Sequence, residues 1–148
     1  MLNLALYQPD IPQNTAAIIR LCSCFDTTLE IIEPCGFHID DKRLKRVAMD
    51  YFKNVKIIRY QNFNEFLKKK NKSRIILMTT KAKKSYCDFK FKLKDTILLG
   101  RESKGVPEII HKSCFQRLKI PLKKNSRSLN IHVAAAITLA EALKQNNF

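Results

Sequence analysis

The stretch Ile75-Ile76-Leu77-Met78 decides the fold. Four consecutive large apolar side chains in a short run indicate a strand that is buried on both faces, which is the usual condition of strands in a parallel sheet. Outward from this run, strand-like and helix-like segments alternate in both directions along the chain. This alternation predicts an α/β domain with a mainly parallel sheet.

The other expected elements follow from hydrophobic periodicity. Runs typical of strands cover residues 2–7, 29–33, 55–59, 74–79 and 96–99, and helical spacing covers residues 14–25, 63–70, 108–112 and 130–144. The last helix is apolar nearly all round and rich in alanine, so we expect it to be buried or to lie at a subunit interface.

The composition is that of a folded globular protein, with 148 residues of which 45% are hydrophobic and 28% charged. No linker or change of composition divides the chain, so we expect one domain over residues 1–148. The formal net charge of +15 favours a polyanionic partner such as nucleic acid. A solvated, lysine-rich surface explains that charge equally well.

Several protein classes are excluded by what the sequence lacks. The longest nearly apolar run, Val133 to Ala140, is far below the ~20 residues of a bilayer span, and the first residues have no export signal. The five cysteines contain no Cys-x-x-Cys pair, Cys22 and Cys24 would point to different faces of a helix, and the Cys35-x-x-His38 pair has no second ligand pair. We therefore expect a cytoplasmic protein with no membrane association and no bound metal.

The segment Gly100-Arg-Glu-Ser-Lys-Gly105 lies between a predicted strand and a predicted helix. Such a loop presents backbone N–H groups to a ligand. It is not followed by the Lys-Ser/Thr of a phosphate-binding Walker loop, and the chain has no Gly-x-Gly of a dinucleotide-binding fold, so both classes are excluded. Taken alone, the segment is a turn with a surface glutamate.

Two further segments are richer in polar residues than a simple turn requires. Residues 9–15 join the first predicted strand to the first helix, and Arg20 is expected to project from that helix toward the carboxyl edge of the sheet, or else into solvent. In residues 120–130, Ser128 or Asn125 is expected to cap the last helix. The excess of donors and acceptors there makes a binding loop plausible.

These three segments resemble, in order and spacing, the motifs of the SPOUT class of RNA methyltransferases. Residues 7–15 with 18–22 are similar to the first motif, residues 99–105 to the second, and residues 120–122 with 125–130 to the third. Residues 31–37 and 40–46 also resemble stretches of the smallest members, the bacterial tRNA wobble-nucleotide (cytidine/uridine) ribose 2′-O-methyltransferases. The resemblance covers nearly the whole chain.

The resemblance implies a C-terminal trefoil knot, a homodimer, and S-adenosylmethionine as methyl donor, which leaves as S-adenosylhomocysteine. It places the donor against Met78, Gly100, Ile120 and Ser128, largely through backbone contacts. No partner protein other than a second copy is implied.

The resemblance also implies roles for side chains around the donor. Glu102 would lie over the donor and target pocket, while Asn14 and Asn130 would order the loops or the substrate. Arg20 would be the catalytic residue. Because a guanidinium holds its proton, we expect it to stabilise the developing alkoxide by its charge rather than to act as a base.

The implied substrate is the ribose 2′-hydroxyl of the wobble nucleotide, cytidine or uridine 34, in the anticodon stem-loop of tRNA. Two basic clusters are expected to contact its phosphates, and the lysines at 68–72 are expected to be merely solvated. The clusters comprise Lys81, Lys83, Lys84, Lys123, Lys124 and Arg127.

The chain departs from this subgroup in its last helix. Ile131-His132-Val133 stands where Leu-Ser-Asn is usual, and Ala140 stands where a tyrosine is usual. Two alternatives therefore stay open: a non-catalytic RNA-binding assembly factor of the same fold, or a 2′-O-methyltransferase that acts on rRNA.

Overall fold

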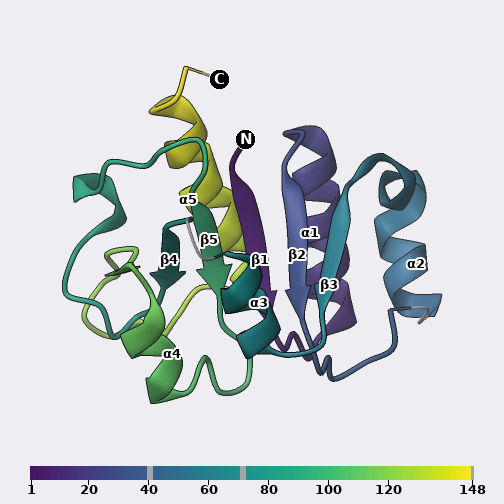
Figure 1. Ribbon diagram of the computed structural model, residues 1–148, viewed down its shortest axis with the longest axis horizontal. Coiled ribbons are helices and arrows are strands. Elements are labelled where there is room, and N and C mark those ends of the chain that lie inside the picture. Colours follow the sequence, from purple (N-terminus) through teal and green to yellow (C-terminus); the bar gives the residue numbers. More distant parts are fainter. Residues whose placement is uncertain (40–41, 71–72, 148) are drawn as a thin grey trace.

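The computed structural model of the protein describes residues 1–39, 42–70 and 73–147 (Figure 1). Its strands form one six-stranded sheet in the order β3-β2-β1-β5-β4-β6, and every pairing is parallel. All the carboxyl ends therefore meet at one edge, which confirms the predicted sheet. The strands are β1 (Asn3–Tyr7), β2 (Thr28–Ile32), β3 (Ile57–Tyr60), β4 (Ile75–Met78), β5 (Thr96–Leu99) and β6 (Gln116–Leu118).

Helices cover both faces of the sheet (Figure 1). The helices α1 (Pro12–Cys24) and α5 (Ile131–Lys144) lie on one face, and α3 (Phe63–Lys69) and α4 (Glu108–Ser113) lie on the other. Two separate clusters of buried side chains result, with Leu4 and Leu6 in the first and Ala5 and Leu77 in the second. Burial on both faces explains why the strands are apolar throughout. None of the described helices is long and apolar enough to cross a membrane.

The helix α2 (Lys42–Ala48) and the 3₁₀ helices η1 (Met49–Asn54) and η2 (Tyr86–Asp88) were not predicted. Four of the seven residues of α2 are basic, and its three apolar residues, although spaced as in a helix, form too short a run to predict one. Among the α2 side chains that the structure describes, Leu44 and Ala48 are the buried ones, where α2 packs against α1. Residues 40–41 of the stretch 40–46, which carries part of the resemblance, lie outside the described residues.

The segment after β6 is tied to the segment after β4. The backbone N–H of Thr79 donates to Leu118 O (2.8 Å), and that of Tyr86 donates to Lys119 O (3.0 Å). Beyond it, the predicted cap of the last helix is wrong: Asn130, not Ser128 or Asn125, caps α5, because its Oδ1 accepts from the N–H of His132 (3.0 Å). The side chain of Asn130 lies at the helix N-terminus, where that N–H would otherwise lack a partner.

Candidate active site

A cavity of about 530 Å³ opens at the carboxyl edge of the sheet, walled by the loops that follow β1, β4, β5 and β6. The strands β1, β2 and β3 follow one another outward on one side, and β4, β5 and β6 all lie on the other, so the two halves of the sheet meet between β1 and β5. Ligand sites of open α/β sheets lie at such a point.

The structure brings together most of the predicted site residues and leaves six of them outside the walls. The lining includes Met78, Gly100, Ile120, Ser128, Asn14, Glu102, Asn130 and Lys81. The residues outside it are Arg20, Lys83, Lys84, Lys123, Lys124 and Arg127. Sequence reasoning also missed several described residues that line the cavity, among them Arg101, Lys104 and His111.

Two glycines shape the loop after β5 for different reasons. The N–H of Arg101 donates to Gly105 O (3.3 Å) and the N–H of Gly105 donates to Arg101 O (2.9 Å), which closes the loop on itself. A Cβ on Gly100 would lie 2.9 Å from the backbone of Gly105, and Gly105 itself has a φ of +63°. The first position requires the absence of a side chain, and the second requires left-handed backbone.

A chain of side-chain hydrogen bonds links all three motif loops. Asn130 Nδ2 donates to Asn14 Oδ1 (3.1 Å), and Asn14 Nδ2 donates to Glu102 Oε1 (3.2 Å). The backbone N–H of Asp10 donates to the other oxygen, Glu102 Oε2 (3.0 Å). Asn14, Glu102 and Asn130 therefore connect segments that are about 90 to 116 residues apart in the sequence.

Asp10 and Glu102 form a carboxyl pair at the end of this chain. The N–H of Glu102 donates to Asp10 Oδ1 (3.2 Å), and the hydroxyl of Ser103 donates to Asp10 Oδ2. Burial raises the pKa of Glu102, and a hydrogen bond between the two carboxyls raises it further, while that bond lowers the pKa of Asp10. Of the two carboxyls, Glu102 is therefore the one that binds a proton more readily. Apart from its place in the first motif, nothing in the sequence marks Asp10 as a site residue.

Arg20 does not line the cavity of its own chain. Its guanidinium carbon lies 5.0 Å from the ring centroid of Tyr51 in η1, and its side chain is exposed. The expectation that it projects toward the carboxyl edge is not met, because α1 runs away from that edge and Arg20 lies six residues beyond Asn14.

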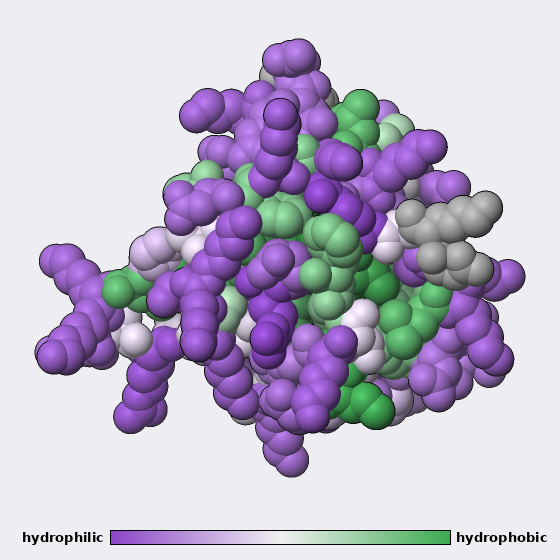
Figure 2. Space-filling view, turned by 60° about the vertical axis from the view of Figure 1, so that its left-hand side comes forward, coloured by the Kyte–Doolittle hydropathy of each residue, from purple (hydrophilic) through white to green (hydrophobic). Residues whose placement is uncertain are grey.

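The two predicted basic clusters lie on neighbouring loops. Ser85 pairs with Lys119 in an isolated parallel bridge, and the N–H of Lys119 donates to Lys84 O (2.9 Å). Lys81 alone among the cluster residues lines the cavity. Figure 2 shows this side of the molecule, where hydrophilic side chains project around an apolar area.

No group of three or more His, Cys, Asp or Glu side chains that could hold a metal ion occurs in the described part of the chain. Burial lowers the pKa of His111, which lies in the wall on α4.

The parallel sheet, the meeting of its two halves between β1 and β5 and the pocket between the loops that follow β1, β4, β5 and β6 define the protein as a SPOUT-type methyltransferase fold. The sequence matches the SpoU rRNA Methylase family over residues 1–140, and the chain belongs to that family. Membership implies the C-terminal trefoil knot that the resemblance predicted.

Full-length relatives are similar to the chain over nearly all of both sequences. A tRNA (cytidine(34)-2'-O)-methyltransferase of Beijerinckia indica is 47% identical over 144 residues, covering 96% of this chain and 90% of the relative. An Escherichia coli protein of the same name is 37% identical over 147 residues, covering 98% and 94%. A protein solved to study the 2-OH methylation of C/U34 on tRNA superimposes with a TM-score of 0.96 at 34% identity, covering 99% of this chain and 97% of that one.

Proposed function

We propose that this protein transfers a methyl group from S-adenosylmethionine to the ribose 2′-hydroxyl of nucleotide 34, cytidine or uridine, in tRNA. The observation that carries the proposal is the hydrogen-bond chain from Asn130 through Asn14 to Glu102, which couples the three motif loops around one cavity. The names of the full-length relatives supply the substrate. The reaction takes place in the cytoplasm, where tRNA is modified.

The cavity suits a methyl donor that is bound mainly by backbone. SpoU methylases use S-adenosylmethionine. Gly100 lies so close to Gly105 that a Cβ there would displace the loop, so a ligand can approach the main chain at this point. Met78, Gly100, Ile120 and Ser128 would hold the donor, and the donor itself supplies the electrophilic methyl carbon.

The chain's own residues position the reaction and need no metal for it. Glu102, fixed by Asp10 and Asn14, orders the wall of the pocket beside the target ribose. In-line alignment of oxygen, carbon and sulfur supplies much of the acceleration of a methyl transfer. A positive charge beside the 2′-oxygen stabilises the alkoxide as the proton leaves, and Arg20 is the residue we assign to that role.

Because Arg20 lies outside the cavity of its own chain, we infer a homodimer in which each pocket receives Arg20 from the partner. The outer faces of α1 and α5 carry small or apolar side chains that are at least partly exposed. A two-fold interface across these faces would bury them and bring α1 of one protomer toward the pocket of the other. The residues are Ala17, Leu21, Val133, Ala136 and Ala140.

The test is to map ribose methylation after incubating tRNA, and separately rRNA, with the protein and labelled S-adenosylmethionine. We expect one 2′-O-methyl group at nucleotide 34 of tRNA. Methylation of rRNA alone would identify the rRNA methyltransferase that the family description names. Binding of tRNA without turnover would identify an assembly factor of the same fold.

A further inference from the structure

Arg101 is one of the residues that line the cavity, and its guanidinium has no acidic partner among the described residues. Its central carbon lies 5.5 Å from the ring centroid of Tyr7, and its Nε is buried and makes no hydrogen bond. Two other arginines are held differently, because Arg59 pairs with Glu33 and Arg74 pairs with Asp95. Within the described residues, Arg101 has a stacking partner and no anion.

A buried N–H donor without an acceptor is costly, and such donors in folded proteins usually have a partner. The planar fork of a guanidinium matches an oxyanion such as a carboxylate or phosphate better than it matches water. The contact with Tyr7 holds the side chain in one direction, so little conformational entropy is lost when an anion binds. These features identify Arg101 as a prepared oxyanion-binding group.

Two oxyanions could reach this wall: the carboxylate of the methyl donor and a phosphate of the RNA. Lys81, Arg101 and Lys104 line the cavity, and Glu102 is the one acidic residue among its described lining. S-adenosylmethionine carries a sulfonium, an ammonium and a carboxylate, and is therefore a net cation at neutral pH. A cationic wall favours the polyanion over this donor.

Although Gly100 directly precedes it, Arg101 places its guanidinium against a different face of the sheet from two other residues assigned to the donor, Met78 and Ile120. Tyr7 belongs to the buried cluster on the α3 and α4 face of the sheet. Met78 and Ile120 belong to, or pack against, the cluster on the α1 and α5 face. The guanidinium of Arg101 thus lies on the Tyr7 side of the sheet, whereas Met78 and Ile120 belong to the other side.

We propose that Arg101 binds a backbone phosphate of the RNA next to the ribose that is methylated, and so positions the 2′-hydroxyl in the pocket. This inference rests on the proposed function for the identity of the RNA. Arg101 is a positioning residue: it fixes the nucleotide, and the ring of Tyr7 fixes Arg101.

The test compares Arg101→Gln and Arg101→Lys with the wild type for the binding of unmodified tRNA over a series of salt concentrations, and for the binding of S-adenosylmethionine alone. The control is Lys69→Gln, which removes one charge from an exposed side chain at the far end of α3. We expect Arg101→Gln to weaken tRNA binding roughly 10- to 100-fold. Its slope of log affinity against log salt should fall by about 0.7 to 0.9.

Arg101→Lys should keep the salt slope and regain only part of the affinity, because an ammonium is a point charge without the fork. The Kd for S-adenosylmethionine should be unchanged in both variants, which also shows that the loop 100–105 is folded. A weakened Kd for the donor in Arg101→Gln would overturn the proposal and place the donor carboxylate at Arg101. An unchanged Kd for tRNA would overturn it too. Both readouts are of binding, so a wild type that fails to methylate nucleotide 34 would overturn the proposed function alone.

Discussion

Gly100 and Gly105 are five residues apart in one loop, yet substitution should affect them differently. We expect Gly100→Ala to weaken binding of S-adenosylmethionine by about tenfold or more, because the new Cβ would lie 2.9 Å from the backbone of Gly105 and would open the loop. Isothermal titration calorimetry measures this loss.

Gly105→Asn is the matched control, since no atom lies within 4 Å of its would-be Cβ and asparagine tolerates left-handed backbone. Its cost should be about 1 kcal/mol of stability with donor affinity nearly retained. Equal donor affinity in Gly100→Ala and the wild type would show that the donor is not held at this loop.

Arg20 should matter for turnover and not for donor binding. We expect Arg20→Ala to lose most of kcat while keeping the Kd for S-adenosylmethionine and the fold, because Arg20 lies away from the cavity of its own chain and is exposed. Arg20→Lys should regain part of kcat if positive charge, rather than the guanidinium fork, stabilises the alkoxide. Single-turnover methylation of tRNA is the measurement.

Lys53→Ala in the neighbouring helix η1 is the control, because it removes an exposed cation close in sequence to Tyr51. A wild-type rate in Arg20→Ala would remove Arg20 from the mechanism.

Among single residues, the sequence could identify side chains that a motif names but not side chains whose role depends on tertiary contacts. Asn14, Glu102 and Asn130 stand in motifs and do form one network. Asp10 and Arg101 gain their roles from partners such as Glu102 and Tyr7, 92 and 94 residues away, and no local pattern contains that relation.

Among the elements, five of the six strands were predicted, whereas the short strand β6, the basic helix α2 and the 3₁₀ helices η1 and η2 were not. Burial on both faces makes each central strand an apolar run, so β4 and β5 agree with their predicted ranges to within one residue. The helix α2 was missed because its helicity depends on docking two residues against α1, while its other described side chains are basic.

One contact between elements should dominate the stability of the edge opposite the pocket. Lys70, which caps the C-terminus of α3, forms an ion pair with Glu30 of β2, and both side chains are at least nine-tenths buried. We expect Lys70→Met to reduce the free energy of unfolding by about 3 to 5 kcal/mol, because it leaves a buried carboxylate without its cation. Chemical denaturation measures the change.

Two further variants make the interpretation specific. Lys69→Met changes an exposed neighbour and should alter stability by no more than about 0.5 kcal/mol. Adding Glu30→Gln to Lys70→Met should recover much of the loss, since the uncompensated charge is then removed as well. A double variant as unstable as Lys70→Met would attribute the loss to packing instead.

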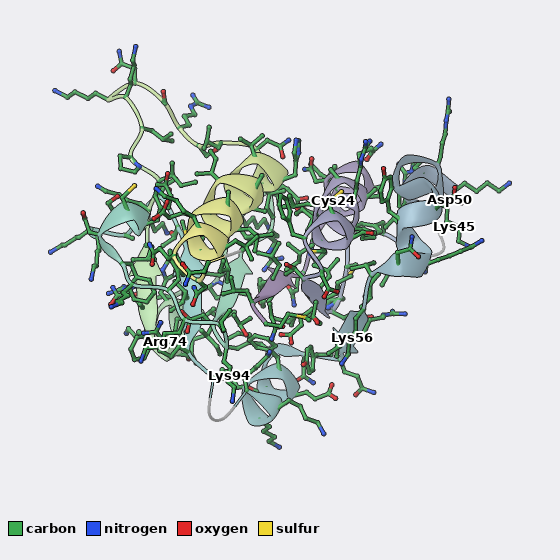
Figure 3. All side chains as sticks on the ribbon, turned by 90° about the horizontal axis from the view of Figure 1, so that it is seen from above. Cys24, Lys45, Asp50, Lys56, Arg74 and Lys94 are labelled. Carbon is green, nitrogen blue, oxygen red and sulfur yellow. The ribbon has the colours of Figure 1, made fainter. Side chains whose placement is uncertain are left out.

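For the molecule as a whole, net charge does not by itself mark the RNA-binding face. Figure 3 looks along the strands from the edge opposite the cavity, and Lys45, Lys56 and Lys94 project outward there too. The distance of a basic side chain from the cavity, rather than the number of basic side chains on a face, must therefore decide which of them contact the substrate.

We expect removal of charge from the two basic clusters to weaken tRNA binding and to flatten its salt dependence. Each cation that no longer meets a phosphate should lower the slope of log affinity against log salt by roughly 0.7 to 0.9. The donor Kd should stay unchanged. The clusters are Lys81, Lys83, Lys84, Lys123, Lys124 and Arg127, and filter binding at several salt concentrations is the measurement.

Lys68 and Lys69 of α3 are the controls, because both are exposed. The expectation that the lysines at 68–72 are merely solvated is wrong for Lys70, which is buried where α3 ends and pairs with Glu30. Residues 71–72 of that run lie outside the described residues. A larger loss in these controls than in the clusters would place the RNA on another face of the molecule.

The path of the chain could not be derived from periodicity. Alternating elements predict a parallel sheet, but they do not specify that β6 pairs beside β4 or that the segment after it is tied to residues 79–86. General rules of chain topology argue against knots, so only the resemblance of the motifs could predict one.

The position of Arg20, outside the pocket of its own chain, predicts how inactive alleles of the gene should behave in combination. If each pocket is completed by the partner, an Arg20→Ala chain still has an intact donor loop, and a Gly100→Ala chain still has an intact Arg20. A heterodimer of one Arg20→Ala chain and one Gly100→Ala chain has one complete site, formed by the donor loop of the first chain and Arg20 of the second. Two alleles that are each inactive alone would then complement each other when expressed in the same cell, whereas two alleles defective in the same half would not.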